Sequence, residues 1–257
     1  MTPPVPHKTP DLDKVARATV AIENDWPSGS STGWHSHSRG QLLYAIEGVM
    51  IVQSAAGSWV VPPHRALWLV AGVAHDVTMS GNVKIRTAYI DAGRVAGLPK
   101  TTGVVSVSPL LRELLVAAVQ IPIDHLGDER DTTLLHLLVH ELRRAVTLPL
   151  HLPRADDPRL RQVCDTLAED PSDTATAHQW ADRLGIASKT LHRLFVKETG
   201  MTFAQWREQA RLLHALRRIA EGGRVIDIAL DCGYASQSAF TAMFKRHFGI
   251  PPSGFCR

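Results

Sequence analysis

The strongest constraint on the fold of this 257-residue chain is a pattern that occurs twice in its C-terminal part. In each copy an alanine comes four residues before a glycine, and a serine comes three residues after that glycine. The two copies are Ala181, Gly185 and Ser188, and Ala229, Gly233 and Ser236. Alanine lets two helices cross closely, glycine accepts the left-handed backbone of a tight turn, and serine can cap the helix that follows. The repeat therefore predicts two helix-turn-helix units.

A long amphipathic segment separates the two copies. Residues 202–221 are predicted to form one helix, because apolar side chains recur along a single face. These are Phe203, Trp206, Ala210, Leu213, Leu216 and Ile219. At about 1.5 Å per residue the helix spans about 30 Å, close to the ~34 Å of one turn of duplex DNA. Such a spacer would present two recognition helices to successive major grooves.

The residues around the second copy carry a family signature. Residues 228–246 read IALDCGYASQSAFTAMFKR, residues 248–252 read FGIPP, and the chain ends at Phe255 and Arg257. This segment resembles the signature of the AraC/XylS family of transcription regulators. Residues 194–200 (LFVKETG) are similar to the family as well, so the resemblance covers about the last hundred residues. It implies a cytoplasmic bacterial regulator that binds double-stranded promoter DNA, acts with RNA polymerase, and more often activates than represses.

The resemblance also implies which side chains of the first recognition helix meet DNA. Helix periodicity turns the apolar residues 191, 194 and 195 inward. It leaves Lys189, His192 and Arg193 outward as predicted readers of base edges, and Lys197 as a predicted phosphate contact. Arg193 has the geometry for two hydrogen bonds to one guanine.

The second recognition helix departs from the family pattern. Its outward side chains are Gln237, Ser238 and Thr241, and Lys245 and Arg246 are predicted to lie near the DNA backbone. Many family members carry an arginine where this chain has an alanine at position 242. We therefore expect this helix mostly to hold phosphates.

The distribution of charge and the spacing of the cysteines agree with an intracellular protein that binds nucleic acid. Residues 159–257 hold 14 Lys+Arg against 10 Asp+Glu, whereas residues 1–158 hold 14 against 15, so the C-terminal part is the basic one. Cys164, Cys232 and Cys256 show no ligand-like spacing, as expected in a reducing cytoplasm. No run of about 18 apolar residues and no secretory leader is recognisable, so no association with a membrane is expected.

The N-terminal part has the pattern of β-structure. Short apolar runs at 41–46, 49–52, 58–61 and 66–70 are separated by glycines and prolines. Strands at this spacing predict a small barrel or sandwich between residues 34 and 90.

Histidines in this region resemble the two motifs of the cupins. His35, His37 and Gln41, followed by Gly48, resemble the first motif, and residues 70–75 (VAGVAH), which end at His75, resemble the second. Two departures are that Gln41 stands where cupins carry Glu, and that the second motif lacks its proline.

The cupin-like histidines predict a ligand site. Residues i and i+2 of a strand share a face, so His35 and His37 are predicted to point together into the barrel, with Gln41 on the same face and His75 on a neighbouring strand. Three imidazoles and one oxygen suit Zn, Fe, Ni or Mn. The cluster is expected either to hold one such divalent metal or to line the pocket of an organic effector.

The expected fold class is α+β multidomain. A cupin-like sensing β-barrel is predicted at 1–107, a helical dimerisation or linker region at 108–158, and an all-α domain with two helix-turn-helix units at 159–257. Leucine-rich helices are predicted at 110–119 and 134–142. Either helix could form the seam of a homodimer, and either could pack on its own barrel.

Three functions are compatible with this organisation. The first is a sequence-specific regulator whose cupin domain senses a small molecule or a metal ion. The second is a metal-dependent cupin enzyme with an accessory DNA-binding domain. It is disfavoured because the candidate acids Glu47 and Asp76 have strand parity opposite to His37 and His75. The third, architectural DNA binding, leaves the N-terminal part unexplained. We expect the regulator, without enzymatic activity.

Overall fold

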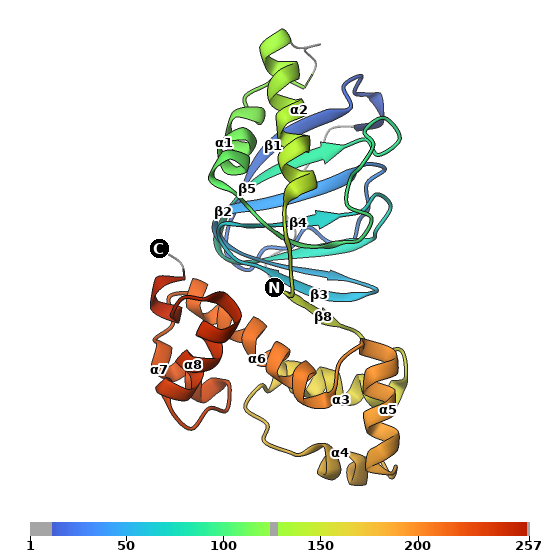
Figure 1. The fold of residues 1–257 in the computed structure, drawn as a ribbon, viewed down its shortest axis with the longest axis vertical. Coiled ribbons are helices and arrows are strands. Elements are labelled where there is room, and N and C mark those ends of the chain that lie inside the picture. Colours follow the sequence, from blue (N-terminus) through green and yellow to red (C-terminus); the bar gives the residue numbers. More distant parts are fainter. Residues whose placement is uncertain (1–11, 124–127, 256–257) are drawn as a thin grey trace. The chain divides into compact units, whose positions relative to one another are not determined.

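The computed structural model describes residues 12–123 and 128–255, and the chain divides into two compact units. Unit 1 comprises Met1–Ala55 and Trp59–Leu150, and unit 2 comprises Ala56–Ser58 and His151–Arg257. Unit 1 is rich in strands and unit 2 is built of helices (Figure 1). The predicted fold class, a sheet-rich domain followed by a helical one, is confirmed.

One sheet organises unit 1. Its strand order in the described residues is β1-β5-β2-β4-β6-β7, and β3 pairs with β2. Strands β2 and β5 are the longest, and they pair antiparallel along most of their length. The strands are β1 (Thr19–Trp26), β2 (Gly40–Ser54), β3 (Gly57–Val61), β4 (Arg65–Leu69), β5 (His75–Ile90), β6 (Gly103–Ser106) and β7 (Thr147–Leu148).

The runs predicted as separate strands at 41–46 and 49–52 form the single strand β2, so this prediction was wrong. Gly48 between them has φ +75°, and the register with β5 shifts on either side of Glu47. A Cβ at Gly48 would lie 2.5 Å from the carbonyl oxygen of Asn82. Gly48 is therefore the glycine of a β-bulge rather than of a turn.

Helices α1 (Pro109–Ala118) and α2 (Glu129–Arg144) lie side by side in unit 1 (Figure 1). Their leucines, with Leu115 and Leu138 completely buried, share one apolar core with Leu42 and Trp68 of the sheet. Helix α2 begins five residues before the predicted start, because the Asp128 carboxylate caps it by accepting from the backbone N–H of residue 131 at 2.8 Å. The two helices are thus part of the fold of unit 1.

Unit 2 contains six α-helices in the described residues. The predicted long helix is confirmed as α6, and Thr202 and Gln205 form a capping box at its start. No helix in the described ranges is long and apolar enough to span a membrane. The helices are α3 (Pro158–Glu169), α4 (Ala177–Arg183), α5 (Ser188–Thr199), α6 (Phe203–Ala220), α7 (Val225–Asp231) and α8 (Gln237–Phe248).

Short elements complete the chain. Strand β8 (His151–Pro153) leads into unit 2, and next to it the Arg154 N–H donates to the carbonyl of Ala56 at 3.2 Å. Single 3₁₀ turns lie at Leu12–Lys14 and Pro252–Gly254. Cys164 and Cys232 are buried free thiols, and burial raises the pKa of each to about 12. Cys256 lies outside the described residues.

Candidate metal centre and nucleic-acid interface

Three histidines from two segments of unit 1 come together, and we call His35, His37 and His75 the histidine cluster. One ring nitrogen of each lies within 4.8 Å of the other two. His35 and His37 precede β2 instead of lying within a strand, so strand parity is not what brings them together. A β-bridge does so: His35 and His75 exchange backbone hydrogen bonds of 3.0 and 2.9 Å. The carbonyl of His37 also accepts from Gly72 at 2.8 Å.

Backbone carbonyls set the ring orientation of two of the histidines. His35 Nδ1 lies 2.7 Å from the Gly33 oxygen, and His75 Nδ1 lies 2.9 Å from the Val73 oxygen. A carbonyl only accepts, so each Nδ1 carries the proton and each Nε2 keeps a free lone pair. The Nε2 atoms of His37 and His75 are buried and have no hydrogen-bond partner in the described residues. Metal-binding histidines are typically held in this way through their second nitrogen.

Gln41, the fourth predicted member of the site, is linked to His37 through Tyr89. Its amide nitrogen donates to the Tyr89 hydroxyl at 3.0 Å, while its buried Oε1 has no partner in the described part of the chain. The Tyr89 ring in turn packs edge-on against His37, with 4.9 Å between the ring centroids. Tyr89 was missed from the sequence because nothing in its spacing relates it to the motif.

Burial favours the neutral form of two of the three histidines, His37 and His75. It lowers the pKa of His37 to about 4, with smaller contributions from the nearby His35 and His75. Burial also lowers the pKa of His75, against the opposite effect of its hydrogen bond to Val73. Neutral imidazole is the form that coordinates metal, so His37 and His75 need no deprotonation near pH 7.

The two predicted helix-turn-helix units share one backbone geometry. Gly185 and Gly233 adopt the left-handed conformation, with φ of +64° and +69°. In each turn the residue after the glycine donates back to the alanine of the repeat. These bonds run from Ile186 to Ala181 (3.0 Å) and from Tyr234 to Ala229 (2.9 Å).

The predicted serine caps differ between the two copies. Ser236 caps α8 by accepting from the Ala239 N–H at 3.2 Å, as predicted. For Ser188 the prediction was wrong, because the cap of α5 is Ala187, one residue earlier. The Ser188 hydroxyl lies instead 3.0 Å from Nδ1 of His178 on α4.

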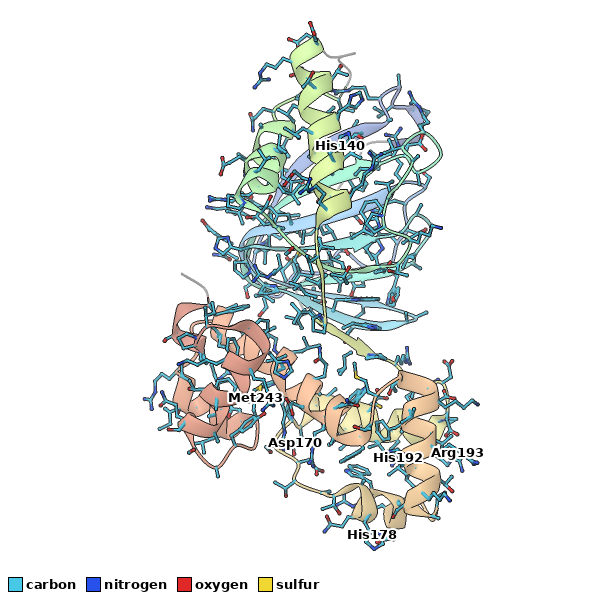
Figure 2. The ribbon with its side chains drawn as sticks, in the orientation of Figure 1. His140, Asp170, His178, His192, Arg193 and Met243 are labelled. Atoms are coloured by element: carbon cyan, nitrogen blue, oxygen red, sulfur yellow. The ribbon has the colours of Figure 1, made fainter. Side chains whose placement is uncertain are left out.

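The side chains predicted to meet DNA lie largely on open helix faces. On α5, Leu191 and Phe195 are buried, as the periodicity predicted. His192 and Arg193 project from the surface of α5 (Figure 2). The exposed candidates are Lys189, His192, Arg193 and Lys197 on α5 and Gln237, Ser238, Lys245 and Arg246 on α8, whereas Thr241 is half-buried.

Arg246 differs from Lys245 because it has an acidic partner. Its Nη2 lies 2.5 Å from Oε1 of Glu208 on α6, and His247 Nε2 lies 2.8 Å from the same oxygen. Burial alone would raise the pKa of Glu208, but the hydrogen bonds from His247 and Arg246 outweigh it and lower the pKa. Glu208 therefore joins α6 to α8, a contact that no spacing in the sequence predicts.

Arg211 of α6 holds two other parts of unit 2. Its Nε and Nη2 donate to the carbonyls of Pro171 and Asp173, at 2.8 and 3.0 Å. Its guanidinium also lies 5.6 Å from the ring centroid of Tyr234, in the turn between α7 and α8. One side chain thus connects the segment before α4 with the second helix-turn-helix.

Comparison with known sequences covers both units. The family described as "AraC-like ligand binding domain" matches residues 21–192, and the family described as "Helix-turn-helix domain" matches residues 180–257. The HTH-type transcriptional regulator NimR of Escherichia coli is 32% identical over 221 residues, which are 86% of this chain and 81% of that protein. The HTH-type transcriptional regulator RipA of Corynebacterium glutamicum is 34% identical over 112 residues, 44% of this chain and 33% of its own.

Solved structures give more distant matches. ToxT from Vibrio cholerae covers 93% of this chain and 98% of its own, with a TM-score of 0.39 and 11% identity. The C-terminal domain of AraT from Geobacillus stearothermophilus covers 39% of this chain and 85% of its own, with a TM-score of 0.37 and 22% identity.

Proposed function

The chain belongs to the AraC family of transcription regulators, and on that premise we propose that its histidine cluster binds the divalent metal ion to which it responds. Membership makes the chain a DNA-binding transcription regulator with a ligand-binding domain. The proposal adds the identity of the ligand.

Unpaired polar atoms of the histidine cluster and of Gln41 carry this proposal. The Nε2 atoms of His37 and His75 and the Oε1 atom of Gln41 are buried without partners in the described residues. Each such atom costs about 1–3 kcal/mol if nothing satisfies it. Three imidazoles and an amide oxygen form a donor set that suits Zn, Fe, Ni or Mn. A metal bound there would use these lone pairs and would join residues 35–37 to the first residue of β5.

We propose sensing rather than catalysis. The two carboxylates nearest the motifs in sequence are already engaged: Asp76 accepts from Ser31 Oγ at 2.6 Å, and Glu47 pairs with Lys84 at 3.1 Å. The named relatives are regulators, which also supports a role without turnover. The metal would change DNA affinity to the extent that it binds two states of the protein with different affinity.

For DNA reading, we propose that Lys189, His192 and Arg193 contact base edges, and that the exposed cations of α8 hold phosphates. We also propose that the protein acts in the cytoplasm as a homodimer and activates transcription together with RNA polymerase. Two exposed leucines support a dimer seam on the helices of unit 1, Leu110 of α1 at 47% and Leu137 of α2 at 40%.

The first experiment is elemental mass spectrometry on untagged protein, beside the double variant His35→Ala/His37→Ala. The matched control is His140→Ala, which removes an exposed histidine outside the cluster. We expect about one metal ion per chain in the wild type and in the control, and almost none in the double variant. Absence of metal after incubation with all four ions would contradict the proposal and leave an organic effector for this site.

DNA binding then separates a sensor from a purely structural metal. Removing and restoring the metal should change the affinity for promoter DNA by about 5- to 150-fold, the usual range of coupling between sites. The double variant should show no such response. Stoichiometric metal without any change in DNA affinity would refute sensing while leaving metal binding intact.

A further inference from the structure

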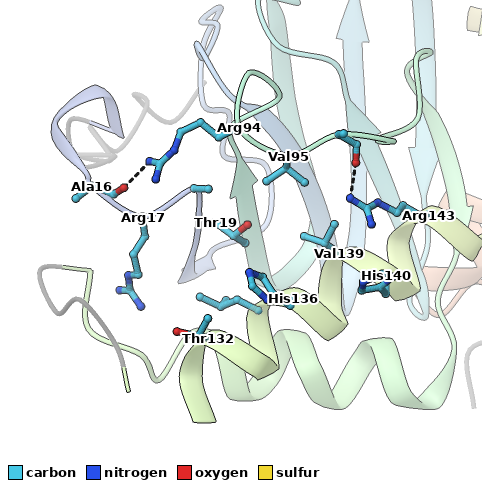
Figure 3. A pocket seen from close by; sticks show the side chains of 13 residues that line it. Ala16, Arg17, Thr19, Arg94, Val95, Thr132, His136, Val139, His140 and Arg143 are labelled. Carbon is cyan, nitrogen blue, oxygen red and sulfur yellow. Dashed lines mark hydrogen bonds between the residues drawn. The ribbon is translucent and has the colours of Figure 1, made fainter. Parts of the chain in front are cut away.

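One cavity of unit 1 shares no residue with the histidine cluster. It has a volume of about 480 Å³ and lies between the N-terminal segment at residues 16–19, the loop at residues 94–96 and helix α2 (Figure 3). This size is within the range of about 300–1,000 Å³ that is typical of small-molecule sites. Its walls come from three segments that are far apart in the sequence.

The polar lining of this cavity is basic. Arg17, Arg94 and Arg143 line it together with His136 and His140, and none of its lining residues is acidic. Three guanidinium groups without a carboxylate produce a positive potential, and apolar walls concentrate that potential. Those walls include Leu135, Val139 and Val95.

Of the three arginines that line the cavity, Arg17 has the most side-chain nitrogens that are buried without a hydrogen-bond partner in the described residues. Its Nη2 donates to the carbonyl of Pro122, but its Nε and Nη1 are shielded from solvent and have no partner in the described residues. The backbone that carries Arg17 is itself held in place. The buried Arg39 donates to the carbonyls of Arg17 and Val15, both at 2.8 Å.

The other two arginines, Arg94 and Arg143, each form a hydrogen bond between segments that line the cavity and keep further N–H donors for a ligand. Arg94 Nη1 donates to the carbonyl of Ala16 at 2.5 Å, and Arg143 Nη2 donates to the carbonyl of Ala96 (Figure 3). A guanidinium has five N–H donors, so one backbone bond leaves enough for a paired contact with an oxyanion. The three arginines therefore suit a ligand with several anionic oxygens.

We propose that this cavity binds a small organic anion that carries more than one carboxylate or phosphate group. The oxyanions would pair with Arg17, Arg94 and Arg143, and the apolar part would rest on Val95 and Val139. Such a ligand would connect the N-terminal segment to α2. The site depends on neither the histidine cluster nor the DNA-reading helices.

The test is isothermal titration of the full-length protein with succinate and, separately, with inorganic phosphate, at constant ionic strength. We expect saturable binding of at least one of the two anions. Arg17→Gln and Arg143→Gln should each weaken it by about tenfold or more, which corresponds to ~1.4 kcal/mol or more. Arg143→Lys keeps the charge without the planar fork and should lie between wild type and Arg143→Gln.

Three controls locate the bound anion. Arg144→Gln removes an exposed charge next to Arg143 that does not line the cavity, and it should bind normally. Arg193→Gln would reveal an anion held by unit 2 and should also bind normally. The double variant of the histidine cluster should retain binding, so failure of the metal proposal would be distinguishable from failure of this one.

Each outcome decides the proposal. Binding of succinate alone assigns a polycarboxylate, and binding of phosphate alone assigns a phosphorylated ligand. No saturable binding of either anion up to ~50 mM, well above the millimolar range of weak specific sites, would overturn the proposal. Unchanged binding in folded Arg17→Gln and Arg143→Gln would overturn it as well, and so would an equal loss in Arg144→Gln.

Discussion

Alanine substitutions at the two turn glycines distinguish two contributions to the loss of stability. One is the strain of a left-handed backbone, and the other is the clash of the added Cβ with its neighbours. Gly185 and Gly233 have almost the same backbone conformation. A Cβ at Gly185 would meet nothing within 4 Å. A Cβ at Gly233 would lie 2.8 Å from Nη2 of Arg211 and 2.9 Å from the carbonyl oxygen of Ser172. Only the second turn is therefore closely packed as well as left-handed.

The expected magnitudes follow from these contacts. The left-handed conformation costs alanine about 1–2 kcal/mol, and the loss of backbone freedom in the unfolded chain offsets about 0.4–1 kcal/mol of it. Gly185→Ala should therefore destabilise unit 2 by about 1 kcal/mol. In Gly233→Ala the Arg211 side chain can turn aside, but the backbone of Ser172 must shift, which adds about 1–3 kcal/mol. We expect a total of about 2–4 kcal/mol for Gly233→Ala.

Urea denaturation of the full chain measures the two losses, and hydrogen exchange assigns them to α4 and α5 or to α7 and α8. Asparagine variants provide the control, because asparagine tolerates the left-handed region better than alanine. Gly185→Asn should recover most of the stability lost in Gly185→Ala. Gly233→Asn should recover little, since its Cβ meets the same atoms.

Equal losses in the two alanine variants, within about 0.5 kcal/mol, would refute this reasoning. They would mean that the packing of Ser172 and Arg211 on the second turn does not persist in solution. Full stability of Gly233→Asn would lead to the same conclusion.

Three further predictions concern DNA binding and pH. Arg193→Ala should weaken binding to the specific site and relax its sequence preference by about 1–3 kcal/mol at one base pair, whereas Lys245→Ala should weaken all sequences about equally; binding assays on randomised sites check both. Glu208→Gln should release Arg246 for a phosphate, so affinity should rise for every sequence and the slope of log K against log salt should steepen by about 0.9; a fall in affinity would show that Glu208 is needed to orient α8. Burial, then Arg217, lowers the pKa of His214, so the unfolded chain takes up this proton first as pH falls below 6.5, and stability decreases from there down to the folded-state pKa. Denaturation at pH 7.5 and pH 5 should therefore show a smaller loss for His214→Gln than for wild type.

Local spacing predicted the parts of the fold and site that depend on it. The repeated glycines gave both turns, because a left-handed residue is a local requirement. The predicted set of His35, His37 and His75 does come together, but through a β-bridge rather than through strand parity. A glycine between two apolar runs is compatible with either a turn or a β-bulge, and the sequence does not distinguish them. Gly48 was predicted to break the strand but lies in a β-bulge of β2.

Contacts between distant segments were beyond the sequence. Glu208 meets Arg246 across 38 positions, and Arg17 shares a cavity with Arg143 across more than a hundred. Neither pair has a spacing that distinguishes it from ordinary surface charges. The cap at Ser188 was mispredicted because α5 already begins at this serine, and its hydroxyl contacts His178 on another helix.

The contacts of Arg211 also bear on the promoters that this protein can recognise. Arg211 of α6 contacts both the segment before α4 and the turn before α8. The two helix-turn-helix units therefore have little freedom to move apart. One base pair inserted between the two DNA half-sites rotates the second half-site by about 34° around the DNA axis. That half-site then no longer faces the helix-turn-helix unit that reads it. Ten inserted base pairs restore the rotational phase but place the second half-site ~34 Å further along the DNA, which is too far for two units joined rigidly through α6. The spacing of its promoter boxes should therefore be invariant, and genome searches for its targets can require that spacing.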